Sequence, residues 1–434
     1  MKGGRVSPSS VVLSVLVALS VALSGVLWFG LDGALIASRP AVKVQVKDAG
    51  DPVQLLLPRQ MVAHLGRDAH ALLLPGDYRY NDVWGAARRI LSHVETAGDA
   101  TVSAEELEEL RREPGLELTF ESAAPLSEWL WAWRGSAGPQ EWPPTRHILI
   151  SLGGSPQVLL QADGESRWAR APLNADDGGL GTALQAVAAE SYYPALPLPA
   201  RVGGFDVAPG LYVAAAGYPV STATVIPDPL KPDVLARSLF ADMSVIRRIA
   251  ERDGADIYTD GARLLRVYAT GQFEYSAPAD AVEATAPTFS QALGRTLEFV
   301  ATHGGWLVGS SLVEQRVDGN AYHLGFALRY NGLPLVQSRP PLQVTMTSQG
   351  VVAYSRSLTP PQGPLNTPLP ATPATDALET LSSGRQGRTG RVVDMYLGYV
   401  RGEEASLSPA WIVVTAAGQT LAVSAISGKE VAVP

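Results

Sequence analysis

The sequence ADIYTDGARLLRVYATGQFEYSAP, residues 255–278, decides how the fold of this chain is interpreted. Apolar and polar residues alternate along it with a period of two, which is typical of β-strands. Asp260-Gly261 and Thr270-Gly271 separate the alternating runs, and such dipeptides favour tight turns. The sequence therefore predicts an antiparallel meander that closes a domain. Its alternating faces are expected to contain Ile257, Thr259, Leu265, Val267, Ala269, Phe273 and Tyr275.

The last third of the chain, after the meander, contains a weak duplication. One predicted unit has a helix at 288–302 and strands at 322–330 and 342–354; the other has a helix at 375–382 and strands at 392–400, 410–415 and 420–425. The proline-rich residues 359–373 between them are expected to form a stiff extended linker. A helix followed by antiparallel strands, twice over, indicates the α+β class.

Short elements of both kinds are predicted before the meander. Ser103 to Glu106 spells SAEE, a capping box that opens an acidic helix. We expect strands at 41–46, 53–57, 69–74, 116–120, 147–152, 158–162, 167–171, 210–216 and 221–226, and further helices at 81–94, 127–133, 180–190 and 232–251.

Three tryptophans lie within five residues, at Trp129, Trp131 and Trp133. An exposed aromatic cluster of this kind could form a platform for carbohydrate. Trp129 and Trp133 are also four positions apart, so that on a helix they share one face and would pack into a core. The second interpretation is favoured.

Two breaks in the pattern divide the chain. The Pro-Gly break after Glu113 and the change of pattern near Ala286 are the predicted boundaries. The predicted organisation is a cytoplasmic N-terminus at 1–10, an anchor at 11–37, an N-terminal α/β domain at 41–113, a central α+β domain at 114–286 and a C-terminal domain at 287–434 with units at 288–358 and 374–433.

The N-terminal apolar run Val11–Leu31, VVLSVLVALSVALSGVLWFGL, contains no charged residue. A bilayer is crossed by about 20 such residues in a helix. Lys2 and Arg5 precede the run, so the positive-inside rule places the N-terminus in the cytoplasm and the rest of the chain outside the cell membrane. A cleaved signal peptide is the alternative, although its apolar region is usually shorter, roughly 7–15 residues.

Small residues form one stripe of the predicted membrane helix. Ser14, Ala18 and Ala22 recur every fourth position and Gly25 follows. Membrane helices associate through close backbone approach over small side chains. This stripe is therefore the predicted partner-binding face.

Composition excludes several kinds of chemistry. The chain has 434 residues, a net charge of −8 and no cysteine, which excludes disulfides, thiolate catalysis and Cys-ligated metals. Outside the N-terminus there is no basic run, so nucleic acid is a poor candidate partner. None of the six histidines lies at a zinc-binding spacing, and no G-x-S-x-G nucleophile motif is present. We therefore expect no catalytic residues, no metal and no cofactor.

Several sequences resemble the YycH family of extracytoplasmic regulatory proteins. They are PLSEWLW at 125–131, IYTDGARLL at 257–265 followed by GQFEY, FVATHGGW at 299–306 and FALRYNGLPLV at 326–336, in that order behind an N-terminal anchor. The ending PAWIVVTAAGQTLAVSAISGKEV, 409–431, is similar to the close of YycH, of its companion YycI and of PepSY-like modules, although Leu421 or Val423 replaces the usual aromatic residue of the second strand.

The resemblance implies a regulator without catalytic activity. Members are single-span proteins that join a YycI-like partner and a WalK-type sensor histidine kinase at the membrane and modulate that kinase, which governs cell-wall metabolism. The alternative is an extracytoplasmic binding module, either a PepSY-like protease inhibitor or a cell-wall polymer binder that uses the tryptophan cluster.

Overall fold

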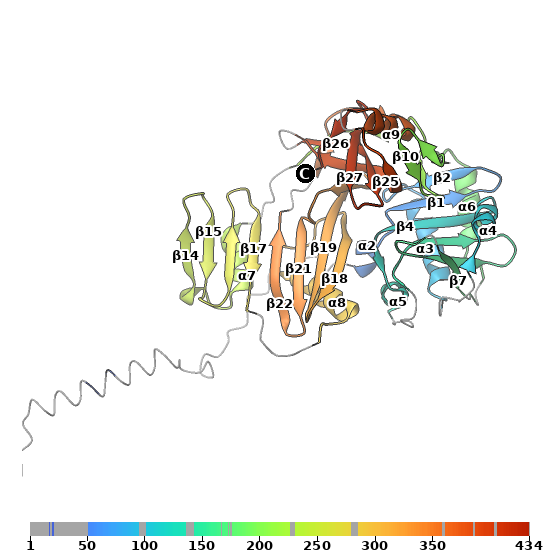
Figure 1. Cartoon of the computed structure of the whole chain (residues 1–434). Helices are drawn as coiled ribbons and strands as arrows, with labels where there is room; N and C mark the ends of the chain where they lie inside the picture. Colours follow the sequence, from blue (N-terminus) through green and yellow to red (C-terminus); the bar gives the residue numbers. More distant parts are fainter. Residues whose placement is uncertain are drawn as a thin grey trace, which may run out of the picture.

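The computed structural model describes residues 17, 20, 51–94, 101–135, 143–165, 167–171, 173, 176–225, 231–278, 285–357, 361–384, 387–402 and 406–433. The predicted anchor at 11–37, its partner-binding face and the predicted strand at 41–46 lie outside these residues, apart from Val17 and Ser20. Among the residues described, no helix is both long and apolar enough to cross a membrane. The fold is α+β and its sheets are predominantly antiparallel (Figure 1).

The first sheet has nine strands in the order β11-β8-β2-β1-β4-β5-β6-β7-β3. They are β1 (Gln60–His64), β2 (His70–Leu73), β3 (Thr101–Val102), β4 (Gly115–Ala124), β5 (Thr145–Ser151), β6 (Gln157–Ala162), β7 (Trp168–Ala171), β8 (Tyr193–Pro197) and β11 (Tyr212–Ala214). The predicted domain boundary at Glu113 needs correction, because β4 lies between β1 and β5 in this sheet. The Pro-Gly break is only the turn that leads into β4.

Helices cover both faces of the first sheet. They are α2 (Pro52–Leu55), α3 (Tyr80–Leu91), α4 (Ala104–Arg111), α5 (Leu126–Arg134) and α6 (Leu180–Ala188). One core contains α3, α5 and α6, whereas α4 packs Leu107 and Leu110 on the opposite face. The strand predicted at 53–57 is wrong: Asp51 accepts a hydrogen bond from the Val53 amide and Pro52 occupies the first helical position, so α2 begins there.

The second sheet has the order β14-β15-β16-β17-β22-β21-β19-β18 and contains the predicted meander. Its strands are β14 (Arg247–Ala250), β15 (Asp256–Thr259), β16 (Leu264–Val267), β17 (Phe273–Ser276), β18 (Ser310–Asp318), β19 (Ala321–Tyr330), β21 (Leu342–Thr347) and β22 (Gly350–Arg356). Helices α7 (Pro232–Leu239) and α8 (Phe289–Thr302) pack on it. Figure 1 shows β14 at one outer edge of the molecule and the first sheet at the other side.

Two details of the second sheet differ from the prediction. In β15 the buried residue is Tyr258, which lies opposite Leu265, so Ile257 and Thr259 are on the open face. The helix predicted at 232–251 ends at Leu239, where Phe240 takes an extended conformation. A short 3₁₀ turn, Met243–Val245, then leads into β14.

The C-terminal part contains helix α9 (Ala374–Ser383) and the strand order β25-β26-β27-β28. These strands are β25 (Gly390–Arg401), β26 (Ser406–Thr415), β27 (Thr420–Ser424) and β28 (Glu430–Val431). Beside them lie β9 (Arg201–Val202), β10 (Phe205–Val207), β13 (Ala223–Val225) and β20 (Leu333–Val336), with β10 and β20 parallel to β25. We call this assembly the C-terminal unit.

Residues 359–373 do more than connect the two helix-and-strand units. Within them, β23 (Pro361–Pro364) pairs with β13, and β24 (Leu369–Pro370) pairs with β12 (Pro219–Val220). Each unit consists of a helix followed by an antiparallel meander: α8 with β18, β19, β21 and β22, and α9 with β25 to β28.

Two large cores and two smaller clusters hold the described elements together. The first joins the helical side of the first sheet to the second sheet, where the rings of Trp131 and Phe289 lie 6.0 Å apart. The second lies between the other face of the first sheet, with Val62 and Leu72, and the C-terminal unit, whose Trp411 is completely buried.

Candidate functional site

A buried triad of charges joins the first sheet to the C-terminal unit. Arg59, just before β1, donates two hydrogen bonds of 2.9 and 2.8 Å to the carboxylate of Asp394 in β25. Arg146 of β5 donates a third, 2.7 Å long. Burial alone would raise the pKa of Asp394, but the charges of Arg59 and Arg146 outweigh it and hold that pKa well below its usual range. The carboxylate therefore remains ionised although it is buried.

Aromatic and backbone groups complete the surroundings of Arg59. Its guanidinium carbon lies 3.7 Å from the centroid of the Tyr396 ring, within the range of a cation–π contact. A second ion pair nearby, Arg329 of β19 with Glu121 of β4, has a distance of 3.7 Å. Arg329 also donates to the Leu57 carbonyl oxygen, 3.1 Å away. These contacts connect the residues before β1 to the first sheet, the second sheet and the C-terminal unit.

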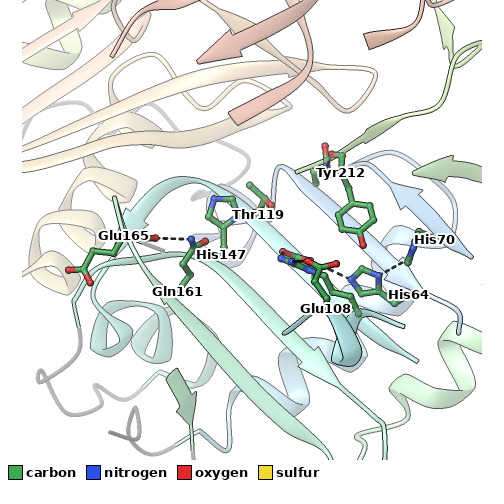
Figure 2. A network of polar contacts seen from close by, with 11 residues as sticks. His64, His70, Glu108, Thr119, His147, Gln161, Glu165 and Tyr212 are labelled. Carbon is green, nitrogen blue, oxygen red and sulfur yellow. Dashed lines mark hydrogen bonds and ion pairs between the residues drawn. The ribbon is translucent and has the colours of Figure 1, made fainter. Parts of the chain in front are cut away.

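A second polar cluster on the first sheet includes His64, His70 and Tyr212, which lie close together (Figure 2). Arg111 of α4 donates two hydrogen bonds, 3.0 and 2.9 Å long, to Glu117 of β4. His64 Nε2 lies 3.4 Å from that carboxylate, and its Nδ1 lies 2.8 Å from Nδ1 of His70. The Tyr212 ring packs edge-on against both imidazoles.

The electrostatics of this cluster favour one charge state. Burial would raise the pKa of Glu117, but Arg111 outweighs it and the pKa lies well below its usual range. Burial, with the adjacent His64, lowers the pKa of His70 to about 4. His70 is therefore neutral at neutral pH, which lets one of the two facing Nδ1 atoms donate and the other accept.

The two clusters are suited to holding parts of the fold together. Their charged groups are paired with one another and covered by packed elements. Among the described residues, no group of three or more His, Asp or Glu side chains could hold a metal ion. The first cluster, which pairs Arg59 and Arg146 with Asp394 of β25, resembles a joint between modules, whereas the second holds α4 to the first sheet.

The predicted tryptophan site has a structural role. Trp129 and Trp133 are buried, stack with ring centroids 5.7 Å apart and pack near Phe120. The favoured interpretation of a core helix is confirmed, and an exposed carbohydrate platform on these two residues is ruled out. The predicted partner face, Ser14, Ala18, Ala22 and Gly25, lies outside the described residues.

Sequence reasoning missed both charged clusters. Arg59 and Asp394 are 335 positions apart and belong to no common motif. The signal that was present is a charged residue inside an apolar alternating strand: Glu117 in LELTF and Asp394 in VVDMYLGYV. Such a residue on a covered face needs a partner, although the sequence does not say which one.

Two comparisons with known proteins find similarity to YycH. Residues 210–413 match the family model of the YycH protein C-terminal domain. Among solved structures, YycH from Bacillus subtilis is similar with a TM-score of 0.62 and 15% sequence identity, over 87% of this chain and 98% of that chain. At this identity the likeness shows the fold.

Two further solved structures are similar over a smaller part of the chain. An uncharacterized protein from Eubacterium rectale has a TM-score of 0.36 at 11% identity, over 55% of this chain and 94% of that chain. The C-terminal domain of YpeB from Bacillus megaterium has a TM-score of 0.28 at 14% identity, over 46% of this chain and 95% of that chain. No curated protein sequence matches this chain.

Proposed function

Because this chain belongs to the YycH family, we propose that it is a membrane-anchored extracytoplasmic regulator of a two-component sensor histidine kinase that controls cell-wall metabolism. The match of residues 210–413 to the YycH C-terminal domain carries this proposal. The YycH-like fold over most of the chain supports it. The protein acts by contacts with a WalK-type kinase and a YycI-like single-span partner, and not as an enzyme.

The proposal places the protein in the cell membrane with its folded part outside. The uncharged run Val11–Leu31 and the preceding Lys2 and Arg5 support this orientation. Affinity capture of the intact protein from membranes tests the proposal. Recovery of a histidine kinase and a second single-span protein would support it. If neither is recovered, or if an extracytoplasmic protease is recovered instead, the binding-module alternative is favoured.

The partner contact is proposed to include the stripe of small residues in the membrane helix. Ala18→Leu with Ala22→Leu preserves length and hydrophobicity but pushes a neighbouring backbone away. Ser20→Leu with Ser24→Leu is the matched control, because at 100° per residue these positions lie on the opposite side of a helix. We expect cross-linking to the captured helix to fall in the first variant only. Equal cross-linking in both variants, at equal protein levels, would mean that the segment serves only as a membrane anchor.

A further inference from the structure

A cavity of about 370 Å³ opens where the second sheet meets the C-terminal unit. Its size lies in the range of small-molecule sites, about 300–1,000 Å³. It is lined by the turn between β16 and β17 with the start of β17, by the connection 337–341 with Gln343 of β21, by residues 355–357 at the end of β22, and by Arg401 at the end of β25.

The backbone arrangement explains why these segments meet. Strand β20 pairs in parallel with β25, with Val336 opposite Val400. The chain then leaves the C-terminal unit through residues 337–341 and enters the second sheet as β21. Arg339 on this crossover and Arg401 just after Val400 are thereby brought to the same cavity. A ligand bound there would contact both modules.

The charges of the cavity are unbalanced toward the positive. Arg339 and Arg401 are both exposed, and neither forms an ion pair with a described residue. Arg356 also lines the cavity, but it is buried and donates to the Gly305 carbonyl oxygen, 2.7 Å away. Among the lining residues that the structure describes, Glu274 is the one carboxylate. The two exposed guanidinium groups are therefore available to an anion from solvent.

The remaining lining groups are mainly neutral and polar. Gln272, Gln337 and Ser338 offer amides and a hydroxyl, and Tyr268 contributes an aromatic ring. Amides and hydroxyls pair with ligand hydroxyl groups, whereas guanidinium groups pair with phosphate or carboxylate, often through two hydrogen bonds. This combination fits a ligand that carries both an anion and several hydroxyls.

We propose that this cavity binds a small anionic ligand with hydroxyl groups, namely a sugar or polyol that carries phosphate or carboxylate. Arg339 and Arg401 hold the anion, and the amides and hydroxyl of the rim hold the hydroxyls. Binding fastens the second sheet to the C-terminal unit. The inference stands on the cavity alone and does not depend on the proposed kinase partner.

The test is calorimetric titration of the full-length chain in mild detergent with glycerol 3-phosphate, glucuronate, inorganic phosphate and glycerol. We expect saturable binding of glycerol 3-phosphate or glucuronate that weakens as salt is added. Which of the two binds identifies the anion. Because hydrogen bonds to a charged group are among the stronger ones, Arg339→Gln with Arg401→Gln should weaken binding about tenfold or more.

Arg247→Gln is the matched control, since Arg247 is also exposed but lies on β14, at the far edge of the second sheet. It should leave the affinity unchanged, whereas Arg339→Lys with Arg401→Lys should retain part of the affinity that the Gln variant loses. Absence of binding by both polyol anions, or an equal loss in the control, would overturn the proposal. Equal affinity for inorganic phosphate and glycerol 3-phosphate would overturn the role of the hydroxyl contacts.

Discussion

Removing the buried carboxylate of Asp394 should loosen the joint between the first sheet and the C-terminal unit. The side chains of Arg59 and Asp394 are only 3% and 5% exposed, so Asp394→Asn leaves the Arg59 charge without a compensating carboxylate in a place that water does not reach. Breaking such a pair costs about 3–5 kcal/mol. We expect a loss near 3 kcal/mol, because the Tyr396 ring still faces the guanidinium.

An exposed ion pair in the same unit provides the control. Arg388 and Glu430 form a contact of 2.8 Å, but their side chains are 27% and 38% exposed. Exposed pairs contribute about 0–1 kcal/mol, so Glu430→Gln should have little effect. Since the two contacts have the same length, the difference between the two losses of stability should come from the difference in burial.

Hydrogen exchange measured by mass spectrometry can report the local effect on β25 and β1. Asp394→Asn should reduce the free energy of opening of both strands, which at 3 kcal/mol is a change of more than 100-fold in the opening equilibrium. Replacing the pair together, Arg59→Met with Asp394→Leu, should recover most of the loss, because the remaining charge, Arg146, is 24% exposed and still donates to the Phe120 carbonyl oxygen. If Asp394→Asn and Glu430→Gln reduce protection equally, the joint does not depend on the buried pair.

Three further outcomes are expected. Gly332 has a φ of +76°, and a Cβ there would lie 2.0 Å from the Pro75 carbonyl oxygen. Gly332→Ala should therefore lower the free energy of unfolding, measured with denaturant, by about 2 kcal/mol or more. A neutral result would contradict the close approach of the two segments. Burial lowers the pKa of His147 to about 4. The stability that neutral His147 contributes is therefore complete above about pH 6.5 and falls by about 3 kcal/mol as the pH is lowered toward 4. Unfolding measured at pH 7 and 4.5 should show less pH dependence in His147→Gln than in His93→Gln, which alters an exposed histidine. Thr288 caps α8, and Thr288→Ala should cost about 1 kcal/mol in thermal unfolding, whereas Thr288→Ser should cost less.

Local patterns in the sequence were enough for several elements. The meander at 255–278 was predicted from its period of two and its turns, and the structure has three strands there. The SAEE sequence predicted the start of α4, where the Ser103 hydroxyl accepts from the Glu106 amide. In each case the deciding interactions join residues within a few positions of one another.

The predictions that failed concern interactions over longer distances. The alternation of residues does not identify the buried side of β15, because Ile257, Tyr258 and Thr259 are all compatible with a covered face. The pairing of Tyr258 with Leu265 determines which side is buried. The boundary at Glu113 failed for the same reason. Between β1 and β4 the chain forms β2, α3, β3 and α4, and no local sequence pattern indicates that β1 and β4 pair.

The residues around Arg59 illustrate this limit most clearly, because their contacts are with distant parts of the chain. Leu57, Arg59 and Gln60 are consecutive or nearly so, and they contact Arg329 of the second sheet, Asp394 of the C-terminal unit and the Tyr212 carbonyl of the first sheet, respectively. The residues that follow α2 therefore contact all three modules, so that a displacement of α2 would act on each of them at once.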